Sequence, residues 1–161
     1  MERGLGHIDF SLADAVATRA LGARLAAVCP PGSLVLLRGP LGAGKTTLVE
    51  GVVEALGAGH AASPTFVLVH AYLGGSMPVS HVDLYRLEDP HDVEDLDIGQ
   101  YVRADGITLV EWPERAADEW AADRIEIDIA LDGDARHAHV EGFGSLADAV
   151  ARLALGPEVR G

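Results

Sequence analysis

Several features that many proteins carry are scarce in this 161-residue chain. Cys29 is the only cysteine, which excludes an internal disulfide and a zinc site built from several cysteines; we interpret it as a buried apolar thiol. No apolar run approaches the roughly 20 residues that span a bilayer. The opening residues 1–10 also lack the basic and then apolar layout of a secretory signal. We therefore expect no membrane segment and a cytoplasmic location.

Positive charge is scarce as well. The chain has 12 Lys and Arg residues against 25 Asp and Glu, which gives a formal net charge of -13. An acidic surface repels the phosphate backbone of nucleic acids, so we do not expect this chain alone to bind nucleic acid directly and tightly. Lysine is almost absent, since Lys45 is the only one.

The length and the hydrophobic content of 48% fit a single domain, residues 1–161, with a substantial core. Continuous apolar runs at 34–37 and 107–110 are typical of strands buried on both faces, as in a parallel sheet. A helix is expected at 12–28, with Ser11 as its N-cap. A second, amphipathic helix follows the first apolar run and ends before Gly57.

The remaining segments predict antiparallel strands and short helices around this centre. The fold class is therefore α/β, with a central parallel sheet flanked by antiparallel strands and helices. The further elements expected are a short strand at 6–10, a hairpin of 65–73 and 78–84, an acidic surface helix or loop at 88–97, a second hairpin of 124–131 and 136–143, and a closing helix at 145–155.

One motif carries chemistry. Residues 39–46, Gly-Pro-Leu-Gly-Ala-Gly-Lys-Thr, match the phosphate-loop pattern G-x-x-x-x-G-K-[ST] and lie between a strand and a helix, as that pattern requires. Its glycines let backbone N–H groups point inward at phosphate oxygens, and the following helix presents its positive end to the same anion. Lys45 adds a charge for the β and γ phosphates, and the Thr46 hydroxyl can ligate Mg²⁺. The residues expected at the nucleotide are Gly39, Leu41, Gly42, Ala43, Gly44, Lys45, Thr46 and Thr47.

An acid beside the magnesium ion is expected at one of two positions. Asp83 follows a mixed run, 79–82, that resembles a hairpin strand, whereas Glu111 follows the central run 107–110. Because ligands in open α/β sheets gather at the carboxyl ends of central strands, the pattern favours Glu111. The alternatives are a turn or helix cap for Asp83 and a solvated strand end for Glu111.

The expected nucleotide is ATP. Guanine-specific switch proteins usually recognise the base through an N-K-x-D motif, and no second lysine exists here to build one. A small-molecule kinase remains an alternative, although the arginines form no cluster like the lid of such kinases. A non-enzymatic, nucleotide-gated binding module is the other alternative.

Four segments in series, GPLGAGKTTLVEG, SPTFVLVHAY, HVDLYRL and LVEWPER, resemble the bacterial ATPases of tRNA threonylcarbamoyladenosine biosynthesis, the TsaE family. The resemblance implies a small P-loop ATPase that binds ATP and Mg²⁺ inside a complex that modifies adenosine 37 of tRNAs reading codons that begin with A. It implies that hydrolysis resets the complex between cycles. The implied partners are the threonylcarbamoyltransferase subunit and its paralogous dimerisation partner, with tRNA contacted only indirectly.

The resemblance also assigns roles to residues. It places Thr46 and Glu111 nearest the magnesium ion, makes Lys45 and Glu111 part of the catalytic site, and gives Asp83 the role of orienting water or the ion's hydration shell. Thr65 resembles a threonine that senses the γ-phosphate, with an ordinary hydroxyl at the start of a strand as the alternative. Arg136 matches an arginine associated with nucleotide, with a solvated hairpin arginine as the alternative.

Other residues near these motifs carry weaker signals. Trp112 is expected beside the site as a packing or partner-contact residue, or else as an ordinary core tryptophan. His137 and His139 alternate on one strand face, but with no third ligand evident a metal pair is not favoured. Pro40 stands where the family commonly has an acidic residue and should stiffen the start of the loop. With no evident arginine finger, ATP turnover by the isolated chain should be slow.

Overall fold

The computed structural model describes residues 6–59, 69–87, 98–116 and 120–155. The elements are β1 (His7–Leu12), α1 (Ala15–Val28), β2 (Ser33–Arg38), α2 (Lys45–Leu56), β3 (Val69–Tyr72), β4 (Val79–Asp83), β5 (Ile107–Glu111), β6 (Arg124–Asp132), β7 (Ala135–Phe143) and α4 (Ala147–Leu155), with single 3₁₀ turns at Ile98–Tyr101, Pro113–Arg115 and Gly144–Leu146.

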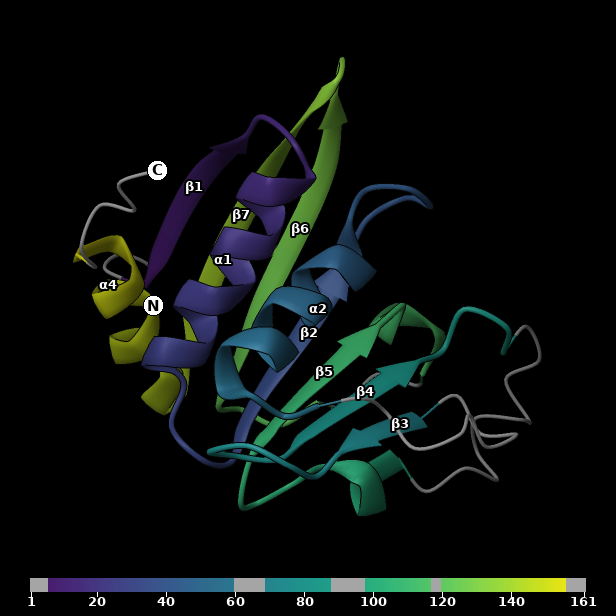
Figure 1. The fold of residues 1–161 in the computed structure, drawn as a ribbon, viewed down its shortest axis with the longest axis vertical. Helices are drawn as coiled ribbons and strands as arrows, with labels where there is room; N and C mark the ends of the chain where they lie inside the picture. The colour runs from purple at the N-terminus through teal and green to yellow at the C-terminus, as the bar shows by residue number, and fades with distance from the viewer. Residues whose placement is uncertain (1–5, 60–68, 88–97, 117–119, 156–161) are drawn as a thin grey trace.

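The strands form one seven-stranded sheet in the order β1-β7-β6-β2-β5-β4-β3. Strands β6, β2, β5 and β4 are parallel to one another, while β7 and β1 at one edge and β3 at the other pair antiparallel. Helices α1, α2 and α4 lie on the same face of the sheet (Figure 1). The predicted α/β class, with its parallel centre and antiparallel flanks, is confirmed. Within the described ranges, no helix is long and apolar enough to cross a membrane.

Apolar side chains fill both faces of the central strands. The larger cluster lies under α1, α2 and α4 and includes Leu37, Leu109 and Ile127, whereas a smaller cluster, with Leu36 and Val110, lies on the opposite face. Alternate residues of one strand thus enter different clusters, which is why β2 and β5 read as unbroken apolar runs. These two buried strands hold the loops at their carboxyl ends in fixed positions.

The start of α1 differs from the prediction. The proposed N-cap, Ser11, belongs to β1 and is paired with His137 of β7 in the sheet. The cap is Asp14, whose Oδ1 accepts a hydrogen bond from the Ala17 N–H at 2.9 Å. Either residue type can cap a helix; Asp14 is the cap because the pairing of β1 with β7 keeps Ser11 in the strand.

The strand that leads to Asp83 also differs from the prediction. The hairpin of β3 and β4 is confirmed, but β4 is an interior strand, because its other edge pairs parallel with β5. Every residue of β4 except Asp83 is buried. The acidic segment 88–97 lies outside the described residues.

Candidate functional site

The phosphate-loop motif joins β2 to the first turn of α2. Gly42 and Gly44 have φ angles of 80° and 106°, a region that residues with a side chain rarely adopt. Gly44 is the N-cap of α2, and no side chain caps the helix there. The first N–H groups of α2 therefore remain available to an anion in front of the loop.

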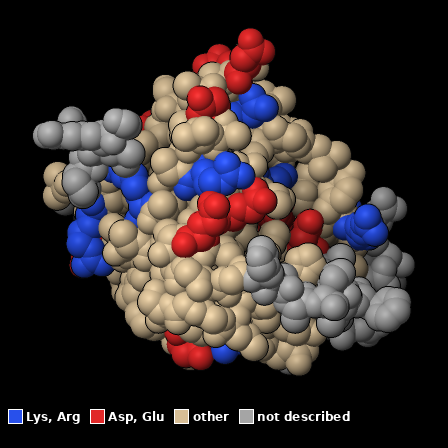
Figure 2. All heavy atoms as spheres, in the orientation of Figure 1, with Lys and Arg blue, Asp and Glu red and all other residues tan. Residues whose placement is uncertain are grey.

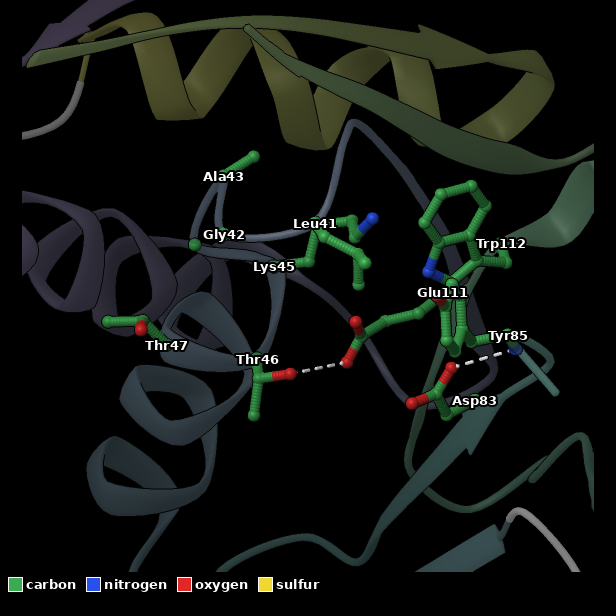
Figure 3. Close-up of a pocket in the computed structure, with 11 residues that line it drawn as sticks. Leu41, Gly42, Ala43, Lys45, Thr46, Thr47, Asp83, Tyr85, Glu111 and Trp112 are labelled. Carbon is green, nitrogen blue, oxygen red and sulfur yellow. Dashed lines mark hydrogen bonds between the residues drawn. The ribbon is translucent and has the colours of Figure 1, made fainter. Parts of the chain in front are cut away.

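An acidic pair lies at the carboxyl ends of two adjacent parallel strands. Asp83 of β4 is paired with Glu111 of β5 in the parallel register of the two strands. Glu111 is only 4% exposed. Its Oε2 accepts a hydrogen bond from the Thr46 hydroxyl at 2.9 Å, which ties the phosphate-loop helix to the end of β5 (Figure 3). The two acids that the sequence offered as alternatives thus lie side by side.

A third residue of this group, His81, was not predicted from the sequence. It is 6% exposed, and its Nε2 lies 2.6 Å from Glu111 Oε2. His81 and Asp83 are two apart on β4, so both side chains point to the same face of the strand. That spacing could have identified His81, had β4 been recognised as the neighbour of β5.

The pKa of Glu111 reflects these contacts. Burial is the largest single influence and raises it. The hydrogen bond and charge of His81, the Thr46 hydroxyl and the charge of Lys45 outweigh burial, so that the pKa lies below its ordinary value. Glu111 is therefore held as a carboxylate although it is almost fully enclosed.

Lys45 is also enclosed. It is 4% exposed, its ammonium donates a hydrogen bond to the Gly39 carbonyl, and Nζ lies 4.0 Å from the centre of the Trp112 ring. Burial lowers the pKa of Lys45, and the nearby Glu111, Glu114 and Asp83 charges oppose that shift. The expected place of Trp112 beside the site is confirmed, and its φ of 59° sets it at a sharp turn after Glu111.

Lys45, Glu111 and Trp112 line a cavity of about 270 Å³. Figure 3 shows the Asp83 and Glu111 carboxylates and the Thr46 hydroxyl converging on it from different elements. Asp83 also accepts a hydrogen bond from the Tyr85 N–H at 3.0 Å, which fixes its rotamer. The lining residues are Leu41, Gly42, Ala43, Gly44, Lys45, Thr46, Thr47, Asp83, Tyr85, Glu111 and Trp112.

A smaller cavity of about 130 Å³ adjoins the other side of the loop. Arg136 of β7 lines it, and its guanidinium donates a hydrogen bond to the Gly42 carbonyl at 3.1 Å. Arg136 thus lies against the phosphate loop although 94 residues separate it from Gly42. Gly39, at the start of the loop, is not among the residues that line either cavity, and Thr65 lies outside the described residues.

The donor set suits Mg²⁺ and a polyphosphate. Mg²⁺ prefers hard oxygen ligands, and a hydroxyl and two carboxylates, from Thr46, Glu111 and Asp83, face one cavity. Lys45 and the free N–H groups at the start of α2 supply positive potential on the same side. The residues present therefore fit a magnesium nucleotide.

Comparisons with known proteins point to one family. The family model described as "Threonylcarbamoyl adenosine biosynthesis protein TsaE" matches residues 12–138. A tRNA threonylcarbamoyladenosine biosynthesis protein TsaE of Synechocystis is 48% identical, with 67% of this chain and 71% of the relative covered. The protein of that name from Streptomyces coelicolor is 46% identical, with 78% and 90% covered.

A solved structure supports the same assignment. The crystal structure of Bacillus subtilis YdiB superposes with a TM-score of 0.77 and 27% identity, with 92% of this chain and 95% of the other covered. The region that the family model matches, residues 12–138, includes the phosphate loop, both acids and most of the sheet. This chain therefore belongs to the TsaE family.

Proposed function

We propose that this protein is a Mg²⁺-dependent ATPase that serves the formation of N6-threonylcarbamoyladenosine at position 37 of tRNAs that read codons beginning with A. Relatives at 46–48% identity are named for tRNA threonylcarbamoyladenosine biosynthesis. The observation that carries the ATPase part is the hydrogen bond between Thr46 and Glu111, because it joins the phosphate loop to a buried carboxylate. Such a pair is what a magnesium ion between nucleotide and protein requires.

The proposed roles follow from position and charge. Lys45 and the loop N–H groups would stabilise charge on the β and γ phosphates, while Thr46 and Glu111 would hold the magnesium ion. Bound there, Mg²⁺ supplies neutralisation of phosphate charge. Asp83, turned into the same cavity, would orient the attacking water or the waters on the ion.

The isolated chain should hydrolyse ATP slowly. Among the described residues, Arg115 and Arg136 lie close to the site, and both already donate to backbone carbonyls, Arg115 to Leu87 and Arg136 to Gly42. Neither is free to act as an arginine finger without moving. We therefore propose that partner proteins, the threonylcarbamoyltransferase subunit and its paralogous dimerisation partner, complete the site in the cytoplasm.

The charge distribution supports an indirect relation to tRNA. Figure 2, drawn from the side of α1 and α2, shows blue groups in several separate places, those near the centre beside red ones, and no blue surface that extends across the described residues of that face. Arg19 of α1, for example, forms ion pairs with Glu50 and Glu54 of α2 at 3.5 Å. The net charge of -13 also disfavours direct tRNA binding, because nucleic-acid phosphates bind to basic surfaces. We propose that tRNA is held by the partners.

Reconstitution tests this function. The chain is combined with the two partner proteins, tRNA, ATP and a source of the threonylcarbamoyl donor, and modified adenosine is measured over many turnovers of the transferase. We expect Lys45→Ala to abolish ATP hydrolysis and multiple-turnover modification together. The matched control is Arg152→Ala, a cation on the exposed side of α4, which should leave both unchanged. Full modification with Lys45→Ala would refute the proposal.

A further inference from the structure

The strands β1 and β7 carry a group of polar side chains on the face turned away from the core. Residues alternate in direction along a strand, so Ile8 and Phe10 pack against the main cluster while Asp9 points the other way. On β7 the residue directly opposite Asp9 is His139. His7 and His137 lie diagonally across from this pair. These side chains are exposed or half-buried, well outside the nucleotide cavities.

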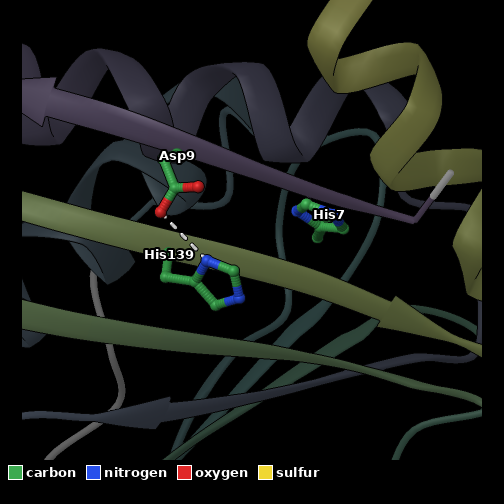
Figure 4. Close-up of side chains that lie close together, drawn as sticks. All are labelled: His7, Asp9 and His139. Carbon is green, nitrogen blue, oxygen red and sulfur yellow. Dashed lines mark hydrogen bonds and ion pairs between the residues drawn. The ribbon is translucent and has the colours of Figure 1, made fainter. Parts of the chain in front are cut away.

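Asp9 is at the centre of the group. Its Oδ1 lies 2.9 Å from His137 Nε2 and 3.0 Å from His139 Nδ1. The His7 and His139 rings are 5.8 Å apart, and one ligand atom from each of His7, Asp9 and His139 lies within 4.8 Å of the others. Figure 4 shows the Asp9 carboxylate and the His139 ring meeting across the two strands, with His7 on the same side. β1 thus supplies two possible ligands, His7 and Asp9, beside His139, and His137, the other histidine of the pair considered from the sequence, is not part of this group.

We propose that His7, Asp9 and His139 form a binding site for a divalent transition-metal ion, of which Zn²⁺ is the best match. Zn²⁺ takes imidazole nitrogen and carboxylate oxygen readily and is satisfied by three protein ligands and one water. Ca²⁺ and Mg²⁺ prefer all-oxygen sites, so the two imidazoles select against them. The ligand atoms, which lie within 4.8 Å of one another, need to approach by up to about 1.5 Å to reach the spacing of tetrahedral zinc ligands, a change that exposed side chains make by rotamer adjustment.

The surroundings also favour a cation. Glu141 Oε1 lies 3.5 Å from His139 Nε2. Asp128 of β6 lies opposite His139 on the other side, so acids flank the imidazole from both neighbouring strands. The resulting negative potential attracts a divalent cation.

Bound metal would join the first strand of the described chain to β7. The two strands already pair antiparallel along the whole of β1, so the ligands are held in register before metal arrives. An ion that binds only the folded arrangement stabilises it by mass action. Zinc should therefore raise the melting temperature of the wild-type protein in a concentration-dependent manner.

Zinc titration of the full chain without a polyhistidine tag tests the proposal. Isothermal titration calorimetry at about pH 7.5 should give one more zinc equivalent for the wild type than for the His7→Ala/His139→Ala variant. The control His70→Ala removes a histidine from β3 at the opposite edge of the sheet and should bind as the wild type does. Identical isotherms for the wild type and the double variant would overturn the proposal.

A second measurement needs no variant and separates this site from the nucleotide site. In a ¹⁵N-labelled wild-type sample, substoichiometric Zn²⁺ should shift the amide resonances of β1 and β7 in addition to any change near Glu111. Shifts confined to the surroundings of His81 and Glu111 would place zinc at the magnesium site and contradict the proposal. Because this experiment uses the native sequence, misfolding of the double variant cannot obscure the answer.

Discussion

Two carboxylates in this protein, Glu111 and Asp9, each lie within hydrogen-bonding distance of histidine, and they differ chiefly in burial. The Glu111 side chain, at the carboxyl end of the interior strand β5, is 5% exposed, whereas the Asp9 side chain, on the edge strand β1, is 50% exposed. The distances to histidine are 2.6 Å for Glu111 and 2.9 and 3.0 Å for Asp9. Similar contacts are therefore set in very different dielectric surroundings.

The difference teaches what burial adds to a polar contact. Around Glu111 the charge is shielded from water, so each partner, His81, Thr46 and Lys45, acts on it strongly and its own desolvation must be overcome. Around Asp9 the hydrogen bonds of His139 and His137 lower its pKa, burial opposes that shift, and solvent screens the interaction. We expect changes at the buried group to alter function severely and changes at the exposed group to be mild.

Neutralising the buried acid should have the largest effect. Glu111→Gln keeps the size of the side chain but removes the charge that faces Thr46 and Lys45. We expect ATP hydrolysis to fall by roughly 100-fold or more, as when a preorganised charge-stabilising group is lost. The control is Asp105→Asn, an exposed acid paired with Arg103, which should hydrolyse ATP at the wild-type rate. Equal rates for the two variants would show that the buried acid has no special role.

Removing the histidine partner of Glu111 should have an intermediate effect. His81→Ala leaves the carboxylate with the Thr46 hydroxyl but without its closest neighbour. Because such supporting contacts orient metal ligands, we expect Mg²⁺ affinity to fall by roughly 10- to 100-fold, measured as the Mg²⁺ dependence of hydrolysis. His81→Gln, which retains a donor, should restore part of the loss. If both variants kept wild-type Mg²⁺ dependence, His81 would be a packing residue only.

The exposed acid should show the smallest effect. The raised pKa of His139 means that its protonation stabilises the fold fully below pH 6.5, and that this contribution is lost as the pH rises through the folded-state pKa. Asp9→Asn should return the pKa of His139 toward 6.5 and flatten the dependence of stability on pH over that window. Titration of the His139 ring resonances by NMR measures the shift. An unchanged His139 pKa would mean that Asp9 does not interact with the ring.

The sequence predicted those parts of the molecule whose signals are local. The phosphate loop and the two apolar runs of β2 and β5 were found because glycine spacing and unbroken hydrophobicity report directly on a tight turn and on two-sided burial. The choice of Glu111 as the buried acid followed from the run before it. Its place opposite Asp83, the contact with His81 and the true N-cap Asp14 were not predicted.

These features depend on long-range pairing. The run before Asp83 contains Ser80 and His81, so it looks half-polar, yet both are buried because β4 is enclosed between β3 and β5. The polar residue that made this run look unlike a buried strand, His81, is also the residue that contacts Glu111 in the site. Likewise, Ser11 is not the N-cap because the pairing of β1 with β7 extends to Leu12 and keeps Ser11 in the strand.

Calorimetric titration with ATP, in the presence and absence of Mg²⁺, tests the central claim most directly. In the wild type, Mg²⁺ should tighten ATP binding, because the ion would join the nucleotide to Thr46 and Glu111. Glu111→Gln should lose most of this tightening, whereas Asp83→Asn, whose acid would act through water, should keep it. Equal tightening by Mg²⁺ in the wild type and Glu111→Gln, or its loss in Asp83→Asn alone, would contradict the assignment of Glu111 as the acid that holds the magnesium ion.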